Sequence, residues 1–284
     1  MEPKKYILNL SCKDQLGIVA AVTNSLSKIG LFVLELSQFS DCSTGQFFMR
    51  IFFENTQNAQ KKVIGEEFSA VSKQFDMKWD LHDSGCKPKI LLMVSKHSHC
   101  LNDLLHRWEN GTLPVEIAGV VSNHRTLEEM TSRCGLPFYL MPITKENKIS
   151  QEKALLDLIR KENIELVVLA RYMQILSEGI CKEMHGKIIN IHHSFLPSFK
   201  GAKPYHQAYD KGVKLIGATA HYVTSDLDEG PIIDQETIRV RHDHTPNELV
   251  RLGQDVECQV LARAVKWHVE QRVFLNRHKT VVFN

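Results

Sequence analysis

Apolar runs along the chain alternate with segments whose apolar positions recur at helical spacing, and this rhythm changes near residue 85. Before that point strands are predicted at 6–11, 32–40, 47–54 and 77–82, separated by helices that end at Gly30 and about residue 75. The resulting βαββαβ order is typical of a ferredoxin-like arrangement.

From residue 89 onward, strands of consecutive apolar residues alternate with amphipathic helices. Strands are predicted at 90–94, 115–121, 138–141, 166–170, 187–191, 214–222 and 231–240, and helices at 101–108, 126–133, 151–162, 177–184 and 245–269. Strands buried on both faces are continuously apolar, so we expect a mostly parallel sheet covered by helices, a Rossmann-like α/β domain. The predicted domains are 1–84 and 89–284, joined by a linker at 85–88 that contains Gly and Pro.

Composition limits the possible functions. The 284 residues carry a net charge of +2, which is too balanced to predict nucleic acid or an anionic membrane as the main partner. No apolar run has the length of a membrane span, and the N-terminus does not resemble a signal peptide. The seven cysteines form no CxxC pair, so reduced thiols and a cytoplasmic location are expected.

The most informative segment lies where a predicted strand ends in Asn190-Ile191-His192. Ligands of open α/β sheets bind at the carboxyl ends of strands. The Asn190 amide and the His192 ring can each donate to an oxyanion. Asp228 follows before Gly230-Pro231 and could move a proton between water and a leaving nitrogen. Together these groups predict attack on an acyl carbon.

Each residue also has a simpler interpretation. An Asn-x-His sequence occurs by chance, and Asp228 could only cap a turn. His193 and His221 could be interior histidines with satisfied hydrogen bonds. A zinc site formed by His192, His193 and His221 is disfavoured, because neighbouring residues of a strand point to opposite faces.

Several segments resemble the formyltransferase fold that uses 10-formyltetrahydrofolate. They are 167–176, similar to its folate loop, Asn190-Ile191-His192 with Asp228, 194–208 and 217–223. The resemblance implies that Asp228 is the acid/base and that Asn190 and His192 polarise the formyl oxygen. It also implies a folate site formed by Met173, Gln174, Ile175, Leu176, Thr224, Ser225 and Asp226.

Parts of this folate site have alternatives. Gln174 stands where the family commonly has arginine, and the apolar residues of 173–176 could simply pack in the core. Arg171 and Lys203 either meet the glutamate tail of the folate or are solvated.

The N-terminal part resembles an ACT domain, an amino-acid-binding regulatory module, in the segment Asp14-Gln15-Leu16-Gly17-Ile18-Val19. The resemblance implies effector contacts at Asp14, Gly17 and Ile18, effectors such as glycine and methionine, and a homo-oligomer, a dimer or tetramer. Gly17 alone is better explained by the strand-to-helix turn, and it is the whole segment together with the βαββαβ order that favours an ACT-like fold.

Both parts together resemble the formyltetrahydrofolate deformylase family. The loop 95–100 lacks the glycines with which glycinamide ribonucleotide transformylases hold the acceptor phosphate, and 192–194 and 205–209 also fit the deformylases. The implied reaction is hydrolysis of 10-formyltetrahydrofolate without a metal or other cofactor, supplying formate for purine and one-carbon metabolism. The alternatives are a folate-dependent formyltransferase with an amine acceptor and a non-catalytic amino-acid sensor.

Overall fold

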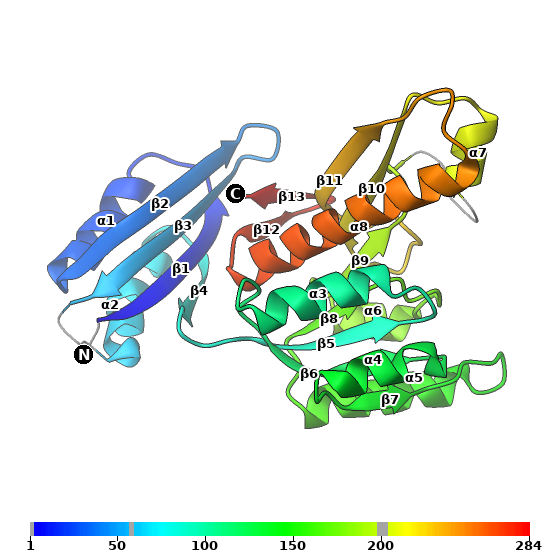
Figure 1. Ribbon diagram of the computed structural model, residues 1–284. Helices are drawn as coiled ribbons and strands as arrows, with labels where there is room; N and C mark the ends of the chain where they lie inside the picture. Colours follow the sequence, from blue (N-terminus) through cyan, green and yellow to red (C-terminus); the bar gives the residue numbers. More distant parts are fainter. Residues whose placement is uncertain (1–2, 57–59, 198–203) are drawn as a thin grey trace. The chain divides into compact units, whose positions relative to one another are not determined.

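The structure, a computed structural model, describes residues 3–56, 60–197 and 204–284 (Figure 1). The chain divides into two compact units. The first contains Met1–Lys87, Glu270–Phe274 and Val281–Asn284, and the second contains Pro88–Val269 and Leu275–Thr280. Two C-terminal segments therefore differ from the predicted division, which placed all residues from 89 onward together.

A network of charged side chains explains why these C-terminal segments belong to the first unit. The buried Arg50 guanidinium donates to the Glu270 carbonyl oxygen at 3.1 Å and to Glu35 Oε1 at 3.0 Å. Arg272 Nη1 donates to the same Glu35 oxygen at 3.1 Å. The ion pairs and the backbone contact thus hold the chain end against the first sheet.

The first unit has the predicted βαββαβ order. Its elements are β1 (Lys4–Lys13), α1 (Ile18–Lys28), β2 (Leu31–Asp41), β3 (Gln46–Asn55), α2 (Lys61–Gln74) and β4 (Lys78–Asp83). The sheet order is β2-β3-β1-β4, and neighbouring strands are antiparallel. The hydrophobic pattern therefore predicted the order of these elements correctly.

Alternation along the strands gives this sheet one apolar face, which the helices cover. Leu8 and Leu10 of β1 and Met49 and Ile51 of β3 point to that face and are at most 1% exposed. They share one core with apolar residues of α1 and α2, such as Phe68.

The second unit has a seven-stranded sheet in the order β11-β10-β9-β8-β5-β6-β7. Strands β5 to β9 are parallel to one another, whereas β10 runs antiparallel to β9 and to β11. The elements are β5 (Lys89–Val94), α3 (His99–Glu109), β6 (Glu116–Ser122), the 3-10 helix η1 (Arg125–Leu127), α4 (Glu128–Arg133), β7 (Phe138–Leu140), α5 (Lys148–Lys161), β8 (Leu166–Leu169), α6 (Glu178–Glu183), β9 (Ile188–His192), α7 (Pro204–Asp210), β10 (Leu215–Tyr222), β11 (Ile232–Arg239) and α8 (Pro246–Val269). The predicted mostly parallel sheet is confirmed.

Helices cover both faces of this sheet (Figure 1). On one face α8 packs against β9, β10 and β11 and also against α3. On the other, α5 and α6 share a core with β8 and its neighbours, through residues such as Leu155, Ile180 and Val167. All four residues of β8 are buried, as expected for a central parallel strand.

Three short elements were not predicted: α7, β12 (Val273–Asn276) and β13 (Lys279–Val282), the last two forming a two-stranded sheet. The turn between these two strands contains Arg277 at φ +57°, a conformation for which the usual sequence signal is glycine or asparagine. α7 begins at Pro204, inside the segment 194–208 that resembles the formyltransferase fold.

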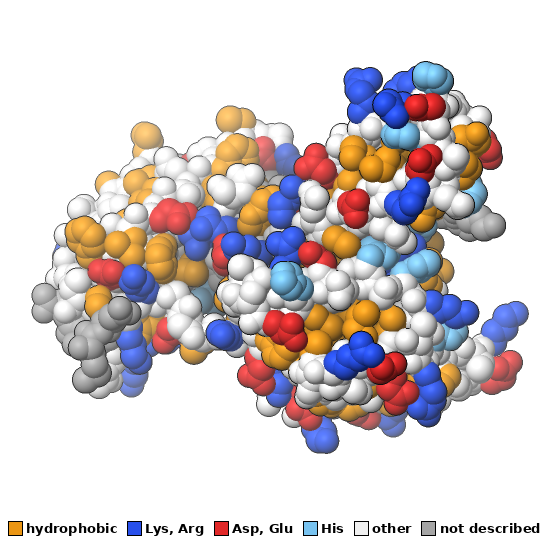
Figure 2. All heavy atoms as spheres, viewed as in Figure 1, with side chains coloured by type: hydrophobic (Ala, Val, Ile, Leu, Met, Phe, Trp, Pro, Cys, Tyr) orange, Lys and Arg blue, Asp and Glu red, His pale blue; other side chains and the backbone are white. Residues whose placement is uncertain are grey.

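Charged side chains of both signs are interspersed over the visible surface (Figure 2), in keeping with the small net charge. Among the described helices, none combines the length and hydropathy needed to cross a membrane.

Candidate functional site

A cavity of about 660 Å³ lies in the second unit, lined by β8, β9 and β10, by the loops that follow β8 and β10, and by α7 and α8. Every predicted catalytic and folate-binding residue lines it: Asn190, His192, Asp228, Met173, Gln174, Ile175, Leu176, Thr224, Ser225 and Asp226. The fold therefore brings together residues that are far apart in the sequence.

The imidazole of His192 faces the carboxylate of Asp228. His192 is the last residue of β9 and is 5% exposed, and its Nδ1 lies 3.2 Å from Asp228 Oδ2. Nε2 is buried and has no hydrogen-bond partner among the described residues. Because Asp228 engages Nδ1, Nε2 is the ring nitrogen left to face a substrate.

Asp228 belongs to the loop after β10 and adopts φ +57°. Burial by itself raises the pKa of this carboxyl group, but the hydrogen bond from His192 and the neighbouring His221 ring outweigh it and hold the pKa below its usual range. The side chain thus faces two imidazoles instead of only capping the turn. It is ionised at neutral pH and able to accept a proton.

Gly230 allows this loop to return close to β10. A Cβ atom built on Gly230 would lie 1.7 Å from the Tyr222 carbonyl oxygen, so any larger residue would push the loop away. The Tyr222 N–H also donates to the Pro231 carbonyl oxygen at 2.9 Å. This close approach positions Asp228 beside His221, whose Nε2 lies 3.6 Å from Oδ1.

His221 orients the Asn190 amide. Its Nδ1 lies 2.9 Å from the Tyr222 carbonyl oxygen, so this nitrogen carries a proton. In the neutral ring Nε2 then accepts one N–H of the Asn190 amide at 3.2 Å. The second N–H of Asn190 remains to donate to a substrate oxygen. Sequence reasoning left His221 as an interior histidine, and its role depends on the antiparallel pairing of β9 with β10, which matches Asn190 with His221.

The loop after β8 presents apolar side chains to the cavity. Met173 and Ile175 are 52% and 59% exposed and line the cavity, so core packing does not explain them. Leu176 lines the cavity too, but at 8% exposure it is also part of the core. The Met173 N–H donates to Ser95 Oγ at 2.9 Å, which ties this loop to the end of β5.

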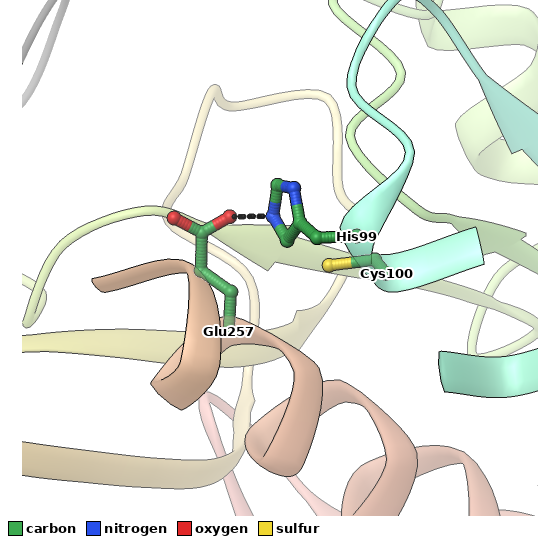
Figure 3. A group of neighbouring side chains, drawn as sticks. All are labelled: His99, Cys100 and Glu257. Atoms are coloured by element: carbon green, nitrogen blue, oxygen red, sulfur yellow. Dashed lines mark hydrogen bonds and ion pairs between the residues drawn. The ribbon is translucent and has the colours of Figure 1, made fainter. Parts of the chain in front are cut away.

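A second group of polar side chains, here called the Glu257 cluster, consists of Glu257, Arg171, Tyr205 and His99. Glu257 Oε2 lies 2.8 Å from His99 Nε2 and 3.4 Å from Arg171 Nε, and Tyr205 Oη–H donates to Oε1 at 2.7 Å. Figure 3 shows the His99 ring on α3 and the Glu257 carboxylate on α8 facing each other. Sequence reasoning missed this cluster.

The position of Arg171 corrects one expectation and leaves another open. Arg171 is only 8% exposed, so the interpretation as a solvated side chain is wrong. It pairs with Glu257 and lines the cavity. Lys203, the other residue suggested for the glutamate tail, lies outside the described residues.

Among the described residues, one group has ligand atoms close enough to hold a metal ion: His99, Cys100 and Glu257, within 4.8 Å of one another. Its chemistry favours a hydrogen-bonded cluster. Burial raises the pKa of the Cys100 thiol, which opposes the thiolate that a metal needs. The Arg171 cation next to Glu257 opposes a second cation there.

The N-terminal residues suggested for effector binding differ in exposure. Gly17 precedes α1 with φ +92°, so the turn itself explains the glycine. Ile18 is 2% exposed and packs in the core, which leaves only its backbone to face a ligand. Asp14 is exposed.

Comparison with known proteins defines first the class of the second unit. Residues 88–265 match the family model described as Formyl transferase. A crystal structure described as glycinamide ribonucleotide transformylase 1 from Symbiobacterium toebii shares the fold, with a TM-score of 0.66 and 26% identity over 72% of this chain and 97% of that one. The cavity-bearing unit is thus a formyl transferase domain.

Two further matches extend over nearly the whole chain. The formyltetrahydrofolate deformylase of Corynebacterium sp. (strain P-1) is 50% identical over 99% of both chains. The crystal structure of formyltetrahydrofolate deformylase from Burkholderia mallei ATCC 23344 has a TM-score of 0.95 and 50% identity, covering 99% of this chain and 100% of that one. The chain therefore belongs to the formyltetrahydrofolate deformylase family.

Proposed function

We propose that this protein is a hydrolase that converts 10-formyltetrahydrofolate and water to tetrahydrofolate and formate. The observation that carries the proposal is the meeting of Asn190, His192 and Asp228 on one cavity that is also lined by the loop 173–176 and by 224–226. Relatives at 50% identity over the full chain are named for this activity. We expect the reaction to take place in the cytoplasm and to supply formate for purine and one-carbon metabolism.

Three side chains carry the chemistry. Water adds to the formyl carbon while the Asp228 carboxylate takes one of its protons. The free N–H of Asn190 and a protonated Nε2 of His192 stabilise the oxyanion that forms, an effect typically worth about 10²–10³ in rate per donor. The C–N10 bond then breaks, N10 takes the proton from Asp228, and formic acid leaves and loses its proton to water to give formate.

The folate is bound by the remaining wall of the cavity. Met173, Ile175 and Leu176 offer apolar surface to the pterin ring, and Gln174 and the segment 224–226 offer polar groups to its edge. Thr224 Oγ1–H donates to the Asp226 carbonyl oxygen at 3.1 Å, which gives this segment a defined shape.

The proposed chemistry uses protein side chains and needs no metal ion or other cofactor. Pre-incubation of the enzyme with a strong chelator should therefore leave the rate of formate release unchanged. A loss of rate that added zinc restores would overturn this part of the proposal.

The first unit is proposed to be an ACT domain that binds small amino acids such as glycine or methionine. Its βαββαβ order supports this, as does the start of α1 at Gly17, where no side-chain cap occupies the helix N–H groups. Addition of each amino acid at millimolar concentration should change the rate of formate release. Unchanged rates and unchanged melting temperatures would contradict effector binding.

The same unit is proposed to pair with a second copy, giving a dimer or tetramer. β2 is an edge strand, and it exposes Phe32, Leu34, Leu36 and Phe39. Figure 2 shows hydrophobic side chains on the visible face of this unit. Light scattering behind a sizing column would measure the mass, and a monomer at micromolar concentration would exclude pairing.

The decisive experiment separates hydrolysis from formyl transfer. Purified protein is incubated with 10-formyltetrahydrofolate, first alone and then with glycinamide ribonucleotide as an amine acceptor. Formate release in both reactions, with no formylated amine, supports the proposal. Formylation of the amine without formate release would favour the alternative, a folate-dependent formyltransferase.

A further inference from the structure

The buried guanidinium of Arg171 is not explained by the proposed chemistry. Its Nε and Nη1 have no hydrogen-bond partner among the described residues, although Nε lies 3.4 Å from Glu257 Oε2. Leaving buried charged donors unsatisfied costs free energy, because water would otherwise hydrate them. Arg171 lines the cavity, directly before the loop 172–176.

Several features fix the Glu257 cluster in place. His99 on α3 and Tyr205 on α7 both bond to the Glu257 carboxylate (Figure 3 shows the first of these contacts). Gly253, one turn before Glu257 on α8, makes room for the tyrosine, because a Cβ built there would lie 2.1 Å from the Tyr205 ring. The cluster is therefore a rigid part of the cavity wall.

His193 connects the cluster with the catalytic residues. Its ring centroid lies 5.3 Å from that of His192 and 6.3 Å from that of Tyr205. Burial and the Arg171 charge lower the pKa of His193 to about 3, and the charges of Glu257, His192 and Asp228 also act on this ring. Through His193 the cluster is connected with the catalytic triad of Asn190, His192 and Asp228, which lines the same cavity.

The fold itself does not decide which nucleophile attacks. A glycinamide ribonucleotide transformylase shares the domain with a TM-score of 0.66, and deformylases share it as well. Side chains around the reacting carbon must therefore make the distinction. In this chain, the cavity wall next to the triad contains three large polar side chains, Arg171, Tyr205 and Glu257.

We propose that the Glu257 cluster selects water as the acceptor, by filling the space that a larger amine would need and by opposing an ammonium group with the Arg171 cation. Water is small and uncharged and can reach the formyl carbon beside His193. With water the new bond is C–O and formate leaves. With an amine it would be C–N, and the amine would lose the proton that N10 gains. This proposal rests on the proposed hydrolysis.

The test measures how the formyl group is partitioned between water and added amines. Full-length enzyme is incubated with 10-formyltetrahydrofolate and with hydroxylamine or glycinamide, and formate and the formylated amine are quantified. The wild type should yield almost no formylglycinamide and little formylhydroxylamine. Arg171→Ala should raise the ratio of formylated amine to formate at least tenfold for both amines.

Two further variants distinguish an effect on the choice between water and amine from a general loss of stability or rate. Arg251→Ala removes the same charge from an exposed position of α8 and should leave the ratio unchanged. Gly253→Ala displaces Tyr205 without changing charge and should raise the ratio for hydroxylamine. A purely structural role of the cluster would change rates and stability but not the ratio.

Each outcome decides between these interpretations. Ratios that stay at the wild-type value in both Arg171→Ala and Gly253→Ala would overturn the proposal, as would efficient formylation of glycinamide by the wild type. If Arg171→Ala does not fold, the test still rests on two comparisons. One is the ratio of formylated amine to formate for hydroxylamine and for the larger glycinamide in the wild type, and the other is that ratio in Gly253→Ala. Absence of formate release by the wild type without amine would instead overturn the proposed hydrolysis.

Discussion

Asp228 and Glu257 are two largely buried carboxylates on one cavity, and their surroundings differ. Asp228 lies on a loop with its side chain 11% exposed, between the imidazoles of His192 and His221. Glu257 lies inside the 24-residue helix α8 at 1% exposure, where His99, Tyr205 and Arg171 surround it. In both, burial raises the pKa and the neighbouring donors outweigh it, so the pKa is lowered.

The difference lies in what the partners can do. Asp228 is held by two imidazoles, whereas Glu257 has one imidazole partner, His99, together with the guanidinium of Arg171 and the phenol of Tyr205. Arg171 stays charged, and burial beside Glu257 raises the pKa of Tyr205, so these two partners of Glu257 keep their protons. The comparison teaches that a carboxylate for proton transfer and one for shape and charge differ mainly in their partners.

The largest expected effect is loss of turnover in Asp228→Asn. The amide keeps the shape of the side chain but cannot take a proton from water, so kcat should fall by about 10²–10⁴. Formate release and melting temperature are measured together, and Glu257→Gln serves as the contrast, with a smaller loss of kcat. A rate of formate release close to wild type in Asp228→Asn would show that Asp228 does not transfer the proton, and the proposed difference in role between Asp228 and Glu257 would be wrong.

The next effect concerns stability. Glu257→Leu leaves Arg171 buried without its counterion, and breaking such a pair typically costs about 3–5 kcal/mol of unfolding free energy. The double variant Glu257→Leu/Arg171→Met removes both charges and should recover most of the loss. Urea unfolding measures the free energy of unfolding of the wild type, the single variant and the double variant. A double variant as unstable as Glu257→Leu would show that the ion pair is not the cause.

A third effect tests the Asn190 amide and its hydrogen bond with His221. Asn190→Ala removes a donor to the oxyanion and should lower kcat by about 10²–10³, with little change in the KM for the folate. His221→Phe keeps the Asn190 amide but removes the ring that orients it, so a smaller decrease is expected. An equal rise in KM with kcat unchanged would assign Asn190 to substrate binding instead.

The two carboxylates also differ in how far the sequence could predict them. Asn190 and His192 lie at the end of an apolar strand, Asp228 follows the next strand just before Gly230-Pro231, and the order of the strands follows from the hydrophobic pattern. Glu257 occupies an ordinary position in a long helix, and its partners lie at 99, 171 and 205, on separate elements. Only the packing of α8 against α3 brings Glu257 to His99, and no local pattern encodes it. The burial of Arg171, which adopts φ +67°, is likewise a result of tertiary structure.

The smallest effect concerns His193, which lies between His192 and Tyr205. Its pKa is about 3 in the folded protein and roughly 6.5 in the unfolded chain. The unfolded chain therefore binds the proton first, and stability is lost as pH falls below about 6.5. Between pH 7 and pH 5 this amounts to about 2 kcal/mol, at about 1.4 kcal/mol for each pKa unit.

Urea unfolding at pH 7 and pH 5 tests whether stability falls with pH as predicted. His193→Gln should lose about 2 kcal/mol less unfolding free energy than the wild type between these two pH values. Parallel losses in the two proteins would mean that His193 titrates normally. Burial is the larger cause of the lowered pKa and the Arg171 charge the second. Adding Arg171→Met should therefore reduce the pH-dependent loss only in part. The remainder then contains burial and the charges of Glu257, His192 and Asp228, and the difference measures how strongly Arg171 acts on the ring beside the catalytic histidine.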